Sequence, residues 1–116
     1  MDARLQQVLT AFVAAHGEYT LARLEFALHH PAKPAPPVVG GGSFESCGGE
    51  LRTLFGEVEM QLDTALAFAG RHERGRRRRR RPDPQFRRYS QALRELDRSA
   101  RALRWMLTIT ESHYDL

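Results

Sequence analysis

The chain of 116 residues is long enough for one hydrophobic core, and its length predicts a single domain. Its one cysteine, Cys47, excludes an internal disulfide and a cysteine-based metal cage. The formal net charge of +4 conceals a strong asymmetry. Residues 1–70 hold 4 basic and 8 acidic side chains, whereas residues 71–104 hold 14 basic and 4 acidic ones, a local net charge of +10. Such a separation of charge is typical of a protein that meets an acidic partner.

The first predicted helix covers about residues 2–30. One face carries apolar residues at the 3.6-residue helical period, namely Leu5, Val8, Leu9, Phe12, Ala15, Tyr19, Ala22 and Phe26. Leu21, Leu24 and Leu28 lie on a different side of the same helix. Two apolar faces need two neighbours. These leucines therefore either cover the third helix of a closed monomer or form an interface with a helical partner or a second copy of the chain.

Residues 31–45 contain four prolines followed by three glycines, which predicts a linker that is stiff at first and flexible later. The second predicted helix covers about residues 46–72, with an apolar stripe formed by Leu51, Leu54, Phe55, Val58, Leu62, Ala65, Leu66 and Ala69. Part of this stripe has the alternating three- and four-residue steps of a coiled coil. Two heptads are too few to require a coiled coil, so bundle packing is the interpretation we adopt.

The segment 71–83 is crowded with arginine, and its like charges predict an extended or mobile linker. Asp83 followed by Pro84 is typical of a helix start, because the carboxylate caps free amides and proline suits the first turn. The third predicted helix covers about residues 84–113, with a core stripe of Phe86, Tyr89, Leu93, Leu96, Ala100, Leu103 and Leu107. Together these segments predict an all-α fold, an up-down-up three-helix bundle.

The strongest functional signal is the arginine run, six consecutive arginines from Arg76 to Arg81. On a helical wheel, four arginines of the third helix and Trp105 share a face opposite the leucine stripe. Charge next to an exposed aromatic suits phosphate contacts and base stacking. Alternatively, this row is a solvated face on which Glu95 and Asp97 pair with nearby arginines. The candidate binding residues are Arg74, Arg76, Arg77, Arg78, Arg79, Arg80, Arg81, Arg87, Arg88, Arg94, Arg98, Arg101 and Trp105.

These features predict a small non-enzymatic module that contacts nucleic acid or another acidic partner. No zinc-finger spacing and no other base-reading motif is present, so we expect binding without sequence specificity. The alternative is an assembly or adaptor subunit, homo-oligomeric or bound to a helical protein. Its arginine run would then be a nuclear localisation signal read by an import receptor, or a solvated spacer.

We expect no catalytic group, cofactor or metal in this chain. Glu25 and His29 supply only two ligands on one helix face, and the other histidines are predicted to lie at the surface or at helix ends. No apolar run approaches the roughly 18 residues of a spanning helix. We therefore expect an intracellular protein, nuclear if its source is eukaryotic or viral.

Overall fold

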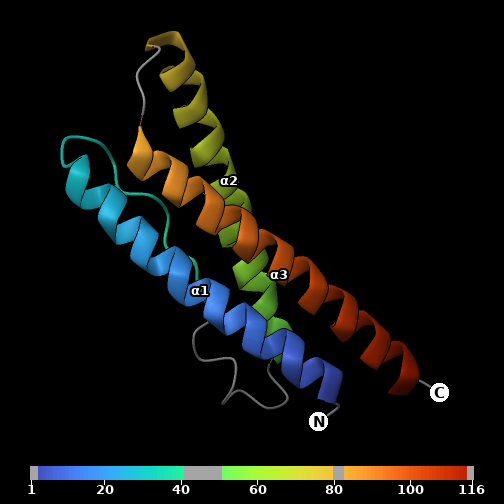
Figure 1. Ribbon diagram of the computed structural model, residues 1–116. Helices are drawn as coiled ribbons and strands as arrows, with labels where there is room; N and C mark the ends of the chain where they lie inside the picture. The colour runs from blue at the N-terminus through green and yellow to red at the C-terminus, as the bar shows by residue number, and fades with distance from the viewer. Residues whose placement is uncertain (1–2, 41–50, 80–82, 115–116) are drawn as a thin grey trace.

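The computed structural model describes residues 3–40, 51–79 and 83–114 and confirms the all-α fold. The helices are α1 (Ala3–His29), α2 (Leu51–Arg79) and α3 (Pro84–Tyr114), and no strand occurs within the described ranges (Figure 1). They form an elongated three-helix bundle of 55 × 22 × 19 Å. The end of α1 and both ends of α3 lie close to the predicted positions, whereas α2 continues beyond its predicted C-terminal end.

The direction of α2 differs from the predicted up-down-up order. Phe12 and Phe55, in the first halves of α1 and α2, have ring centroids 6.4 Å apart. Phe26 and Phe68, in their second halves, are 6.0 Å apart. The two helices are therefore parallel, and α3 runs back against both, as the Phe26–Phe86 contact near its start shows (Figure 1). The topology is up-up-down, so the predicted direction of α2 is wrong.

Residues 31–40 explain the direction of α2. They carry the chain from the end of α1 back toward its first half, so that α2 starts beside the start of α1. After a turn at residues 31–33, residues 34–40 return along α1 in an extended conformation, which prolines favour because they lack an amide donor and fix the backbone. Three hydrogen bonds hold them there, from Arg23 Nε to Pro36 O at 2.7 Å, from Tyr19 Oη to Pro37 O at 2.6 Å, and between His16 Nε2 and Val39 O at 2.5 Å. This return takes the chain back toward the first half of α1 before α2 begins.

The core is formed by most of the residues of the predicted stripes, with Val39 added from the returning segment. Its buried members are Leu5, Leu9, Phe12, Tyr19, Ala22, Phe26, Val39, Phe55, Val58, Leu62, Ala65, Phe86, Tyr89, Leu93, Leu96, Ala100 and Leu103. Leu66 was predicted in the stripe of the second helix, but it is 38% exposed. The two buried tyrosine hydroxyls satisfy each other at 3.0 Å, and Tyr19 also donates to Pro37 O. Burial raises the pKa of both hydroxyls, so this polar pair stays neutral inside the core.

The predicted arginine linker over residues 71–83 is wrong for residues 71–79, which are helical. Arginine is a good helix former, and cations near a helix C-terminus are favoured by the helix dipole. The ion pair between Glu73 Oε1 and Arg76 Nη2, at 2.7 Å, adds local support. These effects offset a like-charge repulsion that costs only tenths of a kcal/mol per neighbouring pair.

Two other boundaries can be compared with the sequence. The predicted start of α3 is confirmed, because Asp83 Oδ1 accepts a hydrogen bond from the Phe86 amide at 3.0 Å. The end of the proline- and glycine-rich linker and the predicted start of the second helix at residue 46 lie outside the described residues.

Candidate anion-binding surface

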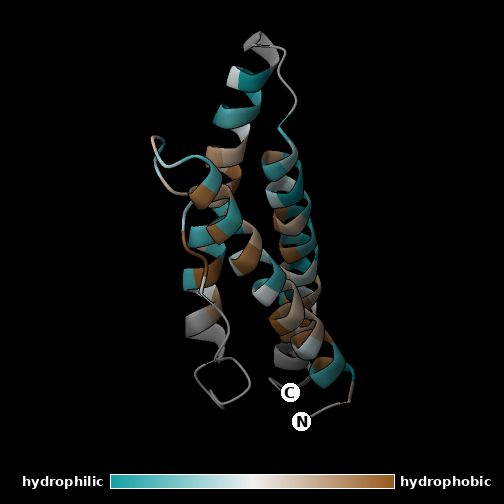
Figure 2. Cartoon of the chain, turned by 60° about the vertical axis from the view of Figure 1, so that its left-hand side comes forward, coloured by the Kyte–Doolittle hydropathy of each residue, from teal (hydrophilic) through white to brown (hydrophobic). Residues whose placement is uncertain are grey.

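The last turns of α2 carry the densest positive charge in the described chain. Arg71 and Arg74 are exposed and Arg76 is half-buried. Arg77, Arg78 and Arg79 belong to the helix, but their side chains lie outside the description, as do Arg80 and Arg81 entirely. Figure 2 shows the strongly hydrophilic character of this end of α2. Part of the run is thus fixed on the helix that packs beside α3.

A hollow of about 540 Å³ lies between this end of α2 and the first half of α3. Its floor is apolar, with Leu66, Phe86 and Leu93. Its basic lining comes from both helices, with Arg76 from α2 and Arg87 and Arg94 from α3, and its acidic members are Glu73 and Asp83. We call it the basic hollow.

The predicted row on α3 divides into two halves of different electrostatic character. The side chains of Arg87 and Arg94 form no hydrogen bond or ion pair with another described residue. Other arginines of α3 form ion pairs. These are Arg98 with Glu95 at 2.9 Å, Arg101 with Asp97 at 3.1 Å, Arg104 with Glu59 at 3.6 Å, and Arg88 with Glu25 at 2.8 Å. The predicted pairing of Glu95 and Asp97 with arginine therefore holds in the second half of α3.

Trp105 lies in this paired half, and 66% of its surface is exposed. A smaller hollow of about 200 Å³ lies nearby between α2 and α3. Its charged lining is mixed, with the carboxylates of Glu59, Asp63 and Asp97 beside the guanidinium groups of Arg101 and Arg104. Trp105 is therefore accessible, but its surroundings are less positive than the basic hollow.

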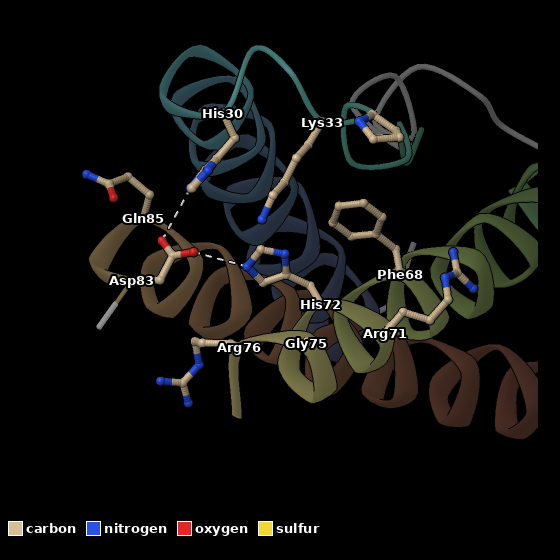
Figure 3. A pocket seen from close by; sticks show the side chains of 10 residues that line it. His30, Lys33, Phe68, Arg71, His72, Gly75, Arg76, Asp83 and Gln85 are labelled. Atoms are coloured by element: carbon tan, nitrogen blue, oxygen red, sulfur yellow. Dashed lines mark hydrogen bonds and ion pairs between the residues drawn. The ribbon is translucent and has the colours of Figure 1, made fainter. Parts of the chain in front are cut away.

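The sequence analysis did not predict a cluster of His30, His72 and Asp83 (Figure 3). The cluster lies at the end of the bundle that holds the last turns of α2 and the start of α3, which we call the arginine end. His72 Nε2 lies 3.0 Å from Asp83 Oδ2, and His30 Nε2 lies 3.4 Å from Asp83 Oδ1. The cluster joins the end of α1, the last turns of α2 and the start of α3. The two histidines are 42 residues apart, and only the parallel direction of α2 brings them together. The capping signal of Asp83 was the one part visible in the sequence.

Asp83 is held in its ionised form by this cluster. Burial alone raises the pKa of its carboxyl group. The hydrogen bond from the Phe86 amide and the interactions with His72 and His30 together outweigh burial, so the net pKa is lowered. Asp83 therefore carries a negative charge at neutral pH, and its two oxygens are occupied by these three partners.

The second apolar face of α1 faces solvent. Leu21, Leu24 and Leu28 are 52%, 47% and 78% exposed. The other sides of α1 pack on α3, on α2 and on the returning segment 31–40. The three leucines do not cover α3, and the structure leaves them available to a partner.

Within residues 3–40, 51–79 and 83–114, no three His, Cys, Asp or Glu side chains are placed to hold a metal ion. In the same ranges, none of the helices combines the length and the hydropathy needed to cross a membrane. Comparison with models of protein families, with curated proteins and with solved structures gives no match to this chain. Its function is therefore argued from its own residues.

Proposed function

We propose that this protein is a non-enzymatic helical module that contacts nucleic acid, without sequence specificity, through the arginine end of α2 and the basic hollow. The observation that carries the proposal is the meeting of two sets of arginines. Arg87 and Arg94, which pair with no described residue, lie on α3 beside the arginine-rich last turns of α2. A polyanion that follows this end of the bundle would meet both sets together.

The physical basis is the neutralisation of phosphates by arginine, which releases condensed counterions. Arginine also offers a planar fork of donors that fits phosphate oxygens. Ser90 and Gln91 lie beside the arginines of the basic hollow, and we expect most contacts to go to the phosphate backbone. Binding should therefore be tolerant of sequence and sensitive to salt.

A salt titration tests the proposal. Fluorescence anisotropy of a labelled oligonucleotide should give an affinity that falls as salt rises. If the six arginines of the run each neutralise a phosphate, the slope of log K against log salt should be about −4 for a single strand and −5 for a duplex. A flat response to salt would overturn the proposal. Tight binding to an acidic protein but not to nucleic acid would reassign the surface to a protein partner.

Substitution of the helical arginines locates the contact. Changing Arg77, Arg78 and Arg79 to glutamine keeps the helix propensity and removes three charges. The slope should become shallower by about 2.7 for a duplex. The matched control changes Arg98, Arg101 and Arg104 to glutamine, because these arginines already pair with carboxylates. An equal loss per arginine in both variants would contradict the proposed location.

The second candidate function is assembly, and the exposed leucines of α1 favour it. Leu21, Leu24 and Leu28 could pack against a second copy or a helical partner. Light scattering of the purified chain tests self-assembly, since a monomer at all accessible concentrations counts strongly against it. Replacing Arg76–Arg81 by glycine and serine and locating the protein in cells tests the nuclear-import alternative. Unchanged location would exclude the run as an address.

A further inference from the structure

A second hollow at the arginine end lies beside the basic hollow and has a different lining. Its volume is about 680 Å³, and it lies between residues 30–34, α2 and the start of α3 (Figure 3). This volume is within the usual range of small-molecule sites. Much of its wall is made of side-chain rings, those of His30, Pro34, Phe68 and His72. We call it the aromatic hollow.

The rings of Phe68 and His72 form one side of the aromatic hollow. Both are partly exposed, they lie one turn apart on α2, and their ring planes differ by only 15°. Phe26 packs against Phe68 from the core, with ring centroids 6.0 Å apart. Phe86 packs against His72, with centroids 4.4 Å apart. Rings that are held from behind and partly exposed in front offer a stacking surface to a flat ligand.

The aromatic hollow adjoins the basic hollow, because Arg76 and Asp83 line both of them. Lys33 enters the aromatic hollow from the turn, and its amine points toward the space between the two imidazoles (Figure 3). The Lys33 side chain has no hydrogen bond or ion pair with another described residue, so its donors are available. A strand whose phosphates lie in the basic hollow would therefore have space for one of its bases in the neighbouring hollow.

We propose that the aromatic hollow binds an unpaired base of a nucleic acid strand, which stacks on Phe68 and His72. This proposal rests on the proposed function and adds that the protein prefers single strands to duplexes. In a duplex the bases are already stacked and paired, so moving one into a pocket costs free energy. Every base has a π-face, and stacking accepts any of them. The preference is therefore for the form of the nucleic acid and not for its sequence.

A comparison of single strand, duplex and abasic strand tests the preference. The three are of equal length, and anisotropy measures their affinities in the same salt. A duplex carries more phosphates, so electrostatics alone favours the duplex. The single strand should nevertheless bind about tenfold more tightly, the effect of one stacked base. The abasic strand keeps every phosphate of the single strand and should lose this gain.

Gly75 offers a way to fill the aromatic hollow without removing a charge. It is exposed, lines the hollow and shares one face of α2 with Phe68 and His72. A Cβ added at Gly75 would meet no described side chain within 4 Å, apart from its chain neighbours. Helical side chains lean toward the preceding turn, so the leucine of Gly75→Leu would cover His72. The single strand should lose about tenfold in affinity, whereas the salt slope of duplex binding should not change.

Gly56→Leu is the matched control. Gly56 is also an exposed glycine of α2 at which an added Cβ meets nothing within 4 Å, and it lines neither hollow. Leucine has a higher helix propensity than glycine, so both variants should fold, which far-UV circular dichroism verifies. A strand with one fluorescent purine analogue gives an independent measurement. Its fluorescence should change in a saturable way with the original chain and with Gly56→Leu, and much less with Gly75→Leu.

Equal or weaker binding of the single strand than of the duplex overturns the proposal. An abasic strand that binds as tightly as the normal strand does the same, and so does an unchanged preference in Gly75→Leu. Failure of the proposed function gives a different result, a flat salt response for the single strand and the duplex alike.

Discussion

The two ends of the bundle contain similar side chains but arrange their charges differently. At the arginine end, Arg87 and Arg94 face the basic hollow and pair with no described residue. At the tryptophan end, which holds Trp105, Arg98 and Arg101 pair with carboxylates of their own helix. The number of arginines along α3 is therefore a poor guide to where a polyanion would bind. The pairing of each arginine decides how much of its charge is available.

This difference matters more for binding than for folding. An exposed ion pair stabilises a protein by only about 0–1 kcal/mol. A phosphate that approaches a paired arginine must nevertheless compete with the carboxylate already beside it. The tryptophan end therefore attracts a polyanion less strongly. Its ion pairs have this effect on binding even though they contribute little to the stability of the fold.

The cores of the two ends also differ, and Phe26→Ala should show the largest effect. Phe26 is fully buried at the arginine end, and its ring contacts Phe68, His72 and Tyr89. Its loss should lower the free energy of unfolding by about 3–5 kcal/mol, measured by urea denaturation. Met60→Ala, at a side chain 71% exposed, is the control and should change it by less than about 0.5 kcal/mol. A change below about 1 kcal/mol for Phe26→Ala would contradict the packing of this end.

Paired substitutions on α3 compare the two ends directly. Arg87→Gln with Arg94→Gln should make the salt slope of duplex binding shallower by about 1.8, the contribution of two phosphate contacts. Arg98→Gln with Arg101→Gln removes the same formal charge from paired positions and should change the slope by less than half of that. Anisotropy in rising salt measures both. Equal changes would remove the distinction between the two ends.

The fold class could be predicted from the sequence because each helix carries a regular apolar stripe. Phe12, Leu62 and Leu96 lie where the stripes placed them, fully or almost fully buried. The direction of α2 could not be predicted in this way, because a stripe has the same period in either direction. The decisive contacts, such as the hydrogen bond of Tyr19 to Pro37 O, join segments whose proximity the local pattern does not encode.

The candidate site was predictable only in part. The exposed arginines and Trp105 follow from the helical wheel, but pairing across helices, as of Arg104 with Glu59, depends on helix placement. The His30–Asp83–His72 cluster depends on the same placement, since it collects residues from three elements. The helical course of Arg77–Arg79 was missed because charge repulsion was weighed without the opposing helix dipole.

Asp83→Ala should have an intermediate effect and should act at the arginine end alone. It removes the cap of α3, which is worth about 1 kcal/mol, and leaves both histidines without their carboxylate. The folded-state pKa of Asp83 is lowered, so its contribution is present above its unfolded pKa and is lost as pH falls through the folded pKa. Urea denaturation should show a gap between the original chain and the variant that is wide at neutral pH and narrows under strong acid. A gap independent of pH would contradict the lowered pKa of Asp83.

Trp105→Ala should have the smallest effect and gives the sharpest test of the tryptophan end. Its side chain is 66% exposed, so the free energy of unfolding should change by less than about 0.5 kcal/mol. Nucleic-acid affinity should also change little, because the arginines beside Trp105 are paired. It is the only tryptophan in the chain, so its fluorescence reports directly on contact with a base. Stacking on an unpaired base is worth about 1–3 kcal/mol. Strong quenching by a single strand, together with an affinity loss of that size in Trp105→Ala, would extend the binding surface along the whole of α3 and remove the contrast between its ends.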